Sequence, residues 1–320
     1  MSRLCLLNHD KQIFINIDEN IDLSKQFIAA TYRQLVLATK CMITIYDLSS
    51  ILLGEQFTNS YDKIIIPNPI LALTSTIDRI IYVYQSIDNS NELKICSIPP
   101  SQLPKQCFTL ESFDINEKIH LCSLDDGTIF LAYDTKIFSL TNDDHWSFDS
   151  RIVKLCSGKE HVLVLLSDGR IFSWGNGLHG ALGHGDLEPC SQPTHIESLS
   201  DNNGVIDIAA GGWHSLALLS DGSAMAWGWN NDGALGLESS DEDNTAGVFC
   251  DPILVTCIPL DVDCTKISAG ARHSAFLGSN DHVWLCGSNK HGQLGNKSTF
   301  LVEKNTSIYC LSWFTVLICS

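Results

Sequence analysis

Apolar and polar residues along this 320-residue chain fall into short runs that have the length of β-strands. In one clear example, residues Ser215–Leu219 are mostly apolar and residues Ser223–Trp227 alternate loosely. Asp221-Gly222 stands between them, and glycine supplies the positive φ that a tight hairpin turn requires. The pattern predicts an antiparallel hairpin. The same device recurs at Asp126-Gly127 and Asp168-Gly169, and in a looser form at Asn280-Asp281.

Histidine, tryptophan and glycine recur together at steps of 53 to 59 residues in the second half of the chain. Self-similarity at a period near 50 indicates a repeat architecture, so we interpret these residues as structural. The recurring residues are His161, His214 and His273; Trp174, Trp227 and Trp284; Gly158, Gly212 and Gly270 before the histidine; and Gly183, Gly236 and Gly295 after the tryptophan.

Each repeat predicts a small antiparallel sheet that is apolar on both faces. A single sheet of this kind cannot bury both faces, whereas a ring of them can. We therefore expect an all-β chain, a seven-bladed β-propeller that forms one domain over residues 1–320. Residues 1–148 would form degenerate blades, residues 149–306 three well-formed repeats, and residues 307–320 a closing strand.

The two ends of the sequence complement each other. Ile308–Ser320 begins like the first strand of a further repeat and then stops, while Arg3–Asn16 reads as a hairpin that lacks such a strand. We expect these N- and C-terminal segments to pair in one composite blade, which would close the ring and leave no free sheet edge.

Composition narrows the class of partner. The formal net charge is −17 and there is no basic run, which argues against direct binding to nucleic acid. The 13 cysteines are odd in number and never spaced C-x-x-C, so we expect neither disulfides nor a zinc site. No apolar run is long enough for a membrane span or a signal peptide. We expect a soluble intracellular protein, monomeric before it forms complexes.

The strings GKEH, SDGRIFSWG and GALG (residues 158–161, 167–175 and 180–183) resemble the regulator of chromosome condensation repeat family, a family of seven-bladed propellers. The resemblance is specific over residues 151–296. The runs at 209–215 and 227–230 and the ending CLSWFTVLI look closest to a small member known as a chromatin-associated partner of a Jumonji-type iron and 2-oxoglutarate dioxygenase. The resemblance implies a similar role for this chain.

The repeated histidines do not predict a metal site, because equivalent positions in successive blades diverge whereas metal ligands converge on one ion. No nucleophile and base form a plausible catalytic constellation, since serine and histidine recur in repeat register. We therefore assign no catalytic, cofactor-binding or metal-binding residue.

Candidate partner-binding residues are those that depart from the repeat. Trp213 and Trp229 lie beside turn glycines where the neighbouring repeats carry Glu160 and Asn176, or Arg272 and Ser288. Tryptophan and arginine are favoured at interface hot spots, so Trp213, Trp229 and Arg272 are candidates. The alternative role for the tryptophans is packing between blades.

Two further candidates lie elsewhere in the sequence. The insertion 238–247 is acidic and includes Asp241, Glu242 and Asp243, which could contact a basic partner such as a histone tail or could simply be solvated. Arg151 opens the first clear repeat. It corresponds to the junction where the resembling protein meets its dioxygenase, so it is a candidate for partner contact or hydroxylation, with an ordinary surface arginine as the alternative.

These observations favour a non-catalytic, chromatin-associated interaction propeller that is partner or scaffold to a Jumonji-type dioxygenase, in the nucleus or else in the cytosol. The alternative is a guanine nucleotide exchange factor for a Ran-like small GTPase. The family's exchange factor has a wedge hairpin with a string like Asp201–Ile206, but here that string precedes the histidine strand instead of following Trp-Gly. An adaptor for ubiquitin or trafficking is a third class.

Overall fold

The computed structural model describes residues 118–200, 204–238, 246–304, 306–311 and 314–319, together with the individual strands before residue 118. Within these described residues the regular elements are strands and one 3-10 turn, η2 (Glu197–Leu199). None of the described residues forms a helix long and apolar enough to cross a membrane. The chain divides into two compact units, one of residues 1–17 and 149–320 and the other of residues 18–148.

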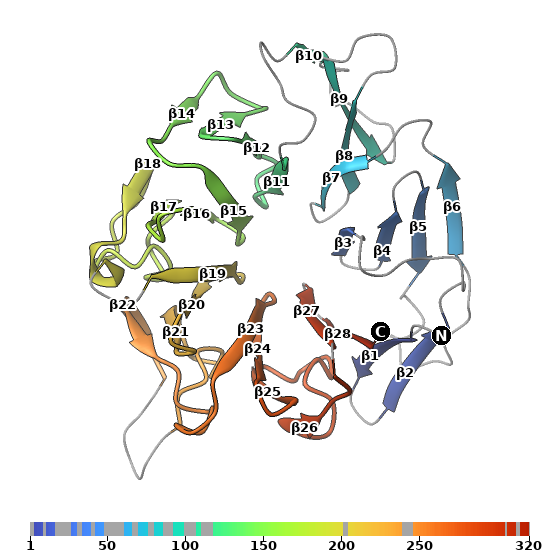
Figure 1. Cartoon of the computed structure of the whole chain (residues 1–320), viewed down its shortest axis with the longest axis vertical. Helices are drawn as coiled ribbons and strands as arrows, with labels where there is room; N and C mark the ends of the chain where they lie inside the picture. Colours follow the sequence, from blue (N-terminus) through green and yellow to red (C-terminus); the bar gives the residue numbers. More distant parts are fainter. Residues whose placement is uncertain are drawn as a thin grey trace. The chain divides into compact units, whose positions relative to one another are not determined.

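The first unit contains four antiparallel sheets, each with four described strands (Figure 1). Three of them follow the chain in simple order, and the fourth combines strands from both ends of the sequence. Their strands are β15 (Ile152–Ser157), β16 (His161–Leu166), β17 (Ile171–Gly175) and β18 (Cys190–His195); β19 (Val205–Ala210), β20 (His214–Leu219), β21 (Ala224–Trp229) and β22 (Val248–Leu254); β23 (Cys264–Ala269), β24 (His273–Gly278), β25 (His282–Gly287) and β26 (Thr299–Leu301); and β27 (Ser307–Leu311), β28 (Phe314–Cys319), β1 (Arg3–Asn8) and β2 (Lys11–Asn16).

The second unit contains three antiparallel sheets of the same size among its described residues. Ile81, Val83 and Leu131 belong to an apolar core shared by two of these sheets. The strands are β3 (Phe27–Ala30), β4 (Gln34–Thr39), β5 (Met42–Asp47) and β6 (Tyr61–Ile65); β7 (Ile70–Ser75), β8 (Ile80–Gln85), β9 (Glu92–Ile98) and β10 (Cys107–Thr109); and β11 (His120–Ser123), β12 (Ile129–Tyr133), β13 (Lys136–Ser139) and β14 (His145–Ser147).

The predicted hairpins form where the Asp-Gly turns stand. Gly127, Gly169 and Gly222 have φ of 89°, 85° and 85°, so each adopts the left-handed conformation that glycine permits. Asp281 occupies the same place in the looser turn and is forced to φ 61°. The third well-formed repeat therefore keeps the hairpin at the cost of backbone strain.

The two ends of the chain share a sheet, with the strand order β2-β1-β28-β27. Strand β1 pairs antiparallel with β28, and Leu4 lies opposite Ile318. Strand β27 occupies the edge position beside β28, as the first strand does in the other three sheets of this unit.

Apolar side chains of neighbouring sheets form the core of the first unit. Leu163, Leu165 and Trp227 are among the fully buried residues that join the β15–β18 sheet to the β19–β22 sheet. Equivalent clusters join the β19–β22 sheet to the β23–β26 sheet, and that sheet to the composite one. Burial stabilises by about 25 cal/mol per Å² of apolar surface, so each sheet depends on its neighbours.

A repeated hydrogen-bond chain crosses the first two of these junctions, and its last bond recurs at the third. His161 Nε2 lies 2.9 Å from Ser215 Oγ in the next sheet, and Ser215 Oγ donates to the carbonyl of Ala181 at 2.8 Å. Since the hydroxyl proton is used on Ala181, Nε2 must carry the proton that bonds to Ser215. The indole of Trp227 donates to the same carbonyl at 2.9 Å. The serine that bonds the recurring histidine and the recurring tryptophan therefore share one buried acceptor.

The next junction repeats this chemistry. His214 Nε2 lies 2.8 Å from Ser274 Oγ, which donates to the carbonyl of Ala234 at 2.7 Å. In the composite sheet, Thr315 takes the serine position and donates to the carbonyl of Gln293 at 2.7 Å. The serine or threonine hydroxyl is thus as much a repeat residue as the histidine.

The imidazole also explains the glycine that precedes it. A Cβ placed on Gly158, Gly211 or Gly270 would overlap the histidine ring three residues later. Gly211, and not Gly212, is therefore the equivalent of Gly158 and Gly270. Gly212 plays a different part, because its N–H donates to the Gly270 carbonyl and its carbonyl accepts from the Lys159 N–H.

Candidate functional site

One end of the three well-formed sheets carries the loops that vary most between repeats. Because the strands are antiparallel, the loop before the second strand and the loop after the third lie at the same end of a sheet. We call this end the loop end. It includes residues 158–160 and 176–180 of the β15–β18 sheet, and the corresponding residues 211–213 and 270–272 of the next two sheets.

The residue before each repeated histidine has the same backbone arrangement and a different side chain. In every case its carbonyl accepts the N–H of the first residue after Trp-Gly or its equivalent. The three bonds are Asn176 N to Glu160 O (2.8 Å), Trp229 N to Trp213 O (2.9 Å) and Ser288 N to Arg272 O (2.9 Å). The fold therefore fixes the backbone at this position and leaves its side chain free to vary.

Trp213 and Trp229 form the centre of an aromatic cluster. Their ring centroids are 5.6 Å apart and their planes stand at 87°, an edge-to-face arrangement. His179, from the preceding sheet, lies 5.5 Å from the Trp213 ring and 6.2 Å from the Trp229 ring. Both tryptophans are half-buried, so each ring keeps part of its surface in contact with solvent.

Two cations from the flanking sheets pack on the Trp213 ring. Lys159 Nζ lies 4.7 Å from its centroid, and Arg272 Cζ lies 5.2 Å from it. Arg272 also lies 4.5 Å from the Trp229 centroid and forms an ion pair of 3.2 Å with Asp232. Cation–π contacts of this kind contribute about 0.5–2 kcal/mol each and hold the rings in place. The cluster is thus preorganised by residues from three successive sheets.

Apolar side chains extend this surface. Leu178 is 62% exposed, and Val248 is 42% exposed and lies opposite Trp229 in the β21–β22 register. A Cβ on Gly180 would approach Val248 Cγ1 to 2.8 Å, which places the loop of Leu178 against that strand. The loop end therefore presents tryptophan edges, aliphatic groups and two cations together, a composition typical of protein interfaces.

The structure brings together three of the predicted partner-binding residues, Trp213, Trp229 and Arg272. Lys159, His179 and Asp232 complete the cluster and were not predicted. A signal for two of them exists in the sequence, because His179 and Asp232 both directly precede a glycine with positive φ, at equivalent positions of their repeats.

Arg151 lies at the end of the β15–β18 sheet that is opposite the loop end. It directly precedes β15, and its carbonyl accepts the Ser167 N–H of the β16–β17 turn. Its side chain is exposed. Strand β15 separates Arg151 from the loop end by six residues, about 20 Å at the rise of an extended strand. Arg151 and Trp213 therefore cannot belong to one small contact.

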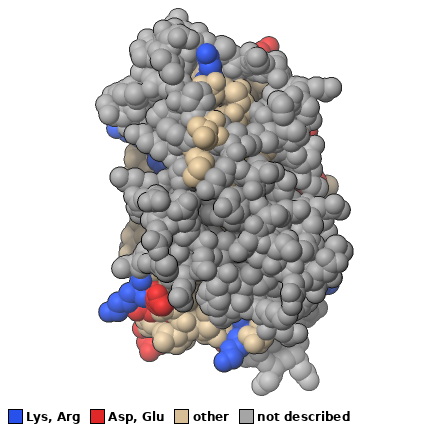
Figure 2. Space-filling view, turned by 90° about the vertical axis from the view of Figure 1, so that its right-hand side faces the viewer, with Lys and Arg blue, Asp and Glu red and all other residues tan. Residues whose placement is uncertain are grey.

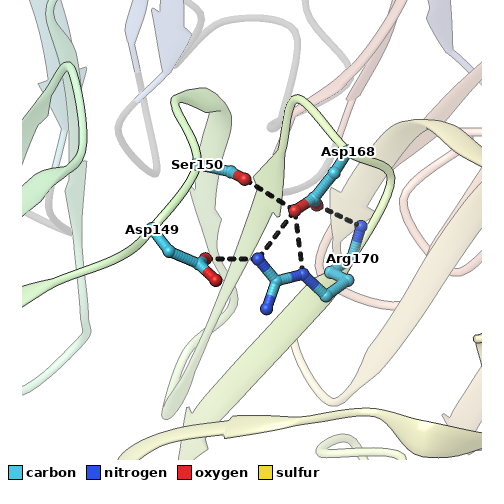
Figure 3. Close-up of polar contacts among 4 residues, drawn as sticks. All are labelled: Asp149, Ser150, Asp168 and Arg170. Carbon is cyan, nitrogen blue, oxygen red and sulfur yellow. Dashed lines mark hydrogen bonds and ion pairs between the residues drawn. The ribbon is translucent and has the colours of Figure 1, made fainter.

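A polar network beside Arg151 fixes the entry to the first repeat (Figure 3). Asp168 accepts from Ser150 Oγ at 2.7 Å and from Arg170 Nε at 2.9 Å, and Arg170 also pairs with Asp149. The hydrogen bonds from Arg170 hold the pKa of the Asp168 carboxyl well below its usual range. In turn, the carboxylates of Asp168 and Asp149 raise the pKa of Arg170. The network anchors residues 149–150 to the hairpin turn.

Two predicted features lie wholly or partly outside the described residues. Asp241, Glu242 and Asp243 of the acidic insertion are not described, nor are Asp201–Asn203. In the rest of the string that resembles the wedge hairpin, Gly204 directly precedes β19, and Val205 and Ile206 are the first residues of that strand.

The repeated histidines lie in three different sheets, and His161 and His214 each bond a hydroxyl of the next sheet. Burial lowers the pKa of His161 and His273 to about 3 and that of His214 to about 4, so all three imidazoles are neutral at physiological pH. Within the described part of the chain, no three histidine, cysteine, aspartate or glutamate side chains gather as metal ligands would.

Charged side chains of the described residues are dispersed on the face that Figure 2 shows. Lysine and arginine side chains form small separate groups there, and one of these groups stands beside acidic side chains. This face offers no continuous basic surface among its coloured residues.

Comparison with known proteins connects these features to one repeat family. Two models of the regulator of chromosome condensation (RCC1) repeat match this chain, one over residues 168–218 and 221–277 and the other over 152–181, 205–234 and 264–293. The chain carries RCC1 repeats, as its sequence predicts.

Two curated relatives match part of the chain. RCC1 domain-containing protein 1 of Homo sapiens is 32% identical over 130 residues, which cover 31% of this chain and 34% of that protein. The ultraviolet-B receptor UVR8 of Arabidopsis thaliana is 35% identical over 101 residues, which cover 31% of this chain and 21% of that protein. The matches thus span about a fifth to a third of these relatives' length.

Solved structures match the fold over the whole chain. Yeast RCC1 (Prp20), in its complex with Kap60, has a TM-score of 0.71 at 16% identity and covers 99% of this chain and 88% of its own. Prp20p of Saccharomyces cerevisiae, studied with its binding to Gsp1p and histones, has a TM-score of 0.65 at 15% identity, covering 99% and 91%. At such identities the likeness shows the fold alone, a β-propeller.

Proposed function

Because this chain carries RCC1 repeats, we propose that it is a non-catalytic protein-interaction propeller, the chromatin-associated partner or scaffold of a Jumonji-type 2-oxoglutarate dioxygenase in the nucleus. The observation that carries the proposal is the loop-end cluster. Trp213 and Arg272 occupy positions where the fold fixes the backbone and frees the side chain, and together with Trp229 they present an aromatic surface typical of interface hot spots.

The proposal includes a seven-bladed ring that closes through the terminal strands and makes residues 1–320 one domain. It is supported by seven four-stranded sheets among the described strands and by the pairing of β1 with β28. Removal of residues 307–320 should then prevent folding, because it leaves β1 with an unpaired edge and uncovers apolar side chains of the β23–β26 sheet. A truncated chain that stays soluble and as stable as the full chain would contradict closure.

A rigid scaffold with variable loops suits a binding role better than catalysis. His161 and His214 bond serine side chains across the sheets, and Trp227 bonds a backbone carbonyl of the preceding sheet, so these repeat residues have a structural use. On this basis the propeller needs no cofactor. Its protein partners, histones or an oxygenase, would bind at the loop end.

Co-purification tests the main proposal. Tagged protein is recovered from nuclear extract and probed for Jumonji-domain oxygenases, with wild type compared against Trp213→Ala and Trp213→Phe. We expect Trp213→Ala to lose the oxygenase at unchanged fold and Trp213→Phe to keep part of it, because phenylalanine preserves an aromatic face. Retention of the oxygenase by Trp213→Ala at wild-type level contradicts the proposed surface.

Arg151 enters the proposal as a second contact or a site of hydroxylation at the opposite end of its sheet. Its exposed side chain beside an anchored turn supports this role. Mass spectrometry of Arg151 peptides after incubation with a co-purified oxygenase tests it, and an unmodified peptide together with unaltered binding by Arg151→Ala would remove Arg151 from the proposal.

Exchange activity on a Ran-like GTPase is the second candidate, favoured by the whole-chain likeness to yeast RCC1. In this case the chain would wedge a loop and acidic side chains against the nucleotide site. Release of a fluorescent guanine nucleotide from Ran distinguishes the two functions. An accelerated release at stoichiometric protein supports exchange, and an unchanged rate supports the interaction role.

A further inference from the structure

The first strands of the four sheets in the 1–17 and 149–320 unit line a cavity of about 450 Å³. These strands, β15, β19, β23 and β27, lie side by side in that order (Figure 1). The volume falls within the 300–1,000 Å³ of small-ligand pockets. This cavity is separate from the loop-end cluster, none of whose residues lines it.

Charged side chains enter this cavity at the same structural position of three successive strands. Lys154, Asp207 and Lys266 each stand directly after a register shift in their strand, opposite Leu165, Leu218 and Leu277 respectively. A β-bulge re-aims the side chain beside it, and such bulges are common next to binding sites. The repeat therefore has a built-in position that directs a side chain into the cavity.

The charges do not cancel. Lys154 Nζ pairs with Asp207 Oδ1 at 2.6 Å. Lys266 Nζ instead donates to the carbonyl of Thr306 at 2.9 Å and lies 3.5 Å from Ser307 Oγ. Among the described residues Lys266 has no carboxylate partner, so an ammonium group with a remaining donor faces the cavity.

Neutral polar groups complete the lining. Ser268, Ser307 and Tyr309 bring hydroxyls to the same cavity. Burial raises the pKa of Cys156 to about 12, so this thiol adds no negative charge. The lining therefore carries two ammonium groups, one carboxylate and several donors, and its net charge is positive in a chain of net charge −17.

We propose that this cavity binds a small oxyanion, a compact molecule bearing phosphate or carboxylate groups, between Lys266 and the Lys154–Asp207 pair. Ammonium groups and hydroxyls recognise both kinds of oxyanion through charge-assisted hydrogen bonds. The bound anion would bridge the first strands of neighbouring sheets and stabilise their arrangement.

Calorimetric titration of the full chain with tripolyphosphate and with citrate tests the site. We expect saturable 1:1 binding of tripolyphosphate or citrate, and the tighter of the two identifies phosphate or carboxylate as the preferred group. Lys266→Met should weaken that binding at least 10-fold, whereas Lys304→Met, at an exposed lysine outside the cavity, should leave it unchanged.

Asp207→Asn provides the sharper variant. It keeps a side chain able to hydrogen-bond while removing the one carboxylate in the lining, so the anion should bind several-fold more tightly. A purely structural role for the three charged residues predicts no such gain. The proposal is overturned if neither anion binds, if Lys266→Met and Lys304→Met weaken binding equally, or, should Lys266→Met fail to fold, if Asp207→Asn binds no more tightly than wild type.

Discussion

Mild acid should destabilise this protein through the three buried histidines. His161, His214 and His273 stay neutral in the folded chain because burial lowers their pKa values from the ordinary 6.5 to about 3, 4 and 3 respectively. Between pH 6.5 and pH 4 these histidines are therefore protonated in the unfolded chain while they remain neutral in the folded chain. The free energy of unfolding must fall as the pH falls through this range, and it is fully retained above pH 6.5.

The magnitude follows from the unfolded state. At pH 5.0 a histidine with a pKa of 6.5 lies 1.5 units below its midpoint, and each unit corresponds to 1.36 kcal/mol, so one group costs about 2 kcal/mol. Since all three folded pKa values lie below 5, the three groups together remove about 6 kcal/mol between pH 7.5 and 5.0. That is a large part of the 5–15 kcal/mol typical of a folded domain.

Urea unfolding at pH 7.5, 6.5, 5.5 and 5.0 measures the effect. His214→Gln removes one titrating group and retains an N–H donor for Ser274, so its loss between pH 7.5 and 5.0 should be about 2 kcal/mol smaller than that of wild type. His145→Gln, at an exposed histidine, is the matched control and should keep the wild-type profile. A wild-type loss below about 2 kcal/mol, or an unaltered profile in His214→Gln, would refute the reasoning.

Three other substitutions test the structural roles. Asp281→Gly should raise the unfolding free energy by about 0.5–1 kcal/mol, because it relieves the left-handed backbone of the third hairpin; no gain in the urea midpoint would contradict that strain. Gly211→Ala should cost about 1–3 kcal/mol by driving a methyl group into the His214 ring, and a wild-type melting temperature would show that the ring has room to move. Arg170→Ala should cost about 0.5–1 kcal/mol at low salt and less in 1 M NaCl, since the ion pairs are partly exposed; a salt-independent loss would point to packing.

The sheets could be predicted from sequence because their signals are local. An Asp-Gly turn between two short apolar runs specifies a hairpin without reference to the rest of the chain, and the recurrence of His161 and Trp174 at later steps identifies the repeat. The sharing of one carbonyl by Ser215 and Trp227 could not be predicted in this way, since it depends on how neighbouring sheets face each other.

The candidate site was predictable only in part, for the same reason. Trp213 and Trp229 stand out because they break the pattern of their own repeat. Lys159 and His179 look ordinary in sequence, and they join the cluster only because the preceding sheet places them against the Trp213 ring. Local departures from a repeat thus identify the centre of a surface, whereas its edges require the angle between sheets.

The central claim is that residues of the repeat pattern hold the sheets together, whereas loop-end residues that differ from that pattern bind the partner. Its most direct test compares Trp213→Ala/Trp229→Ala with Ser274→Ala, by measuring recovery of the Jumonji-type oxygenase per folded molecule together with the urea midpoint. We predict that the tryptophan variant loses the oxygenase with a small shift in midpoint, while Ser274→Ala, which breaks the bonds to His214 and Ala234, lowers the midpoint and keeps the oxygenase. The opposite pattern, with binding lost through Ser274 and stability lost through the tryptophans, would contradict the account.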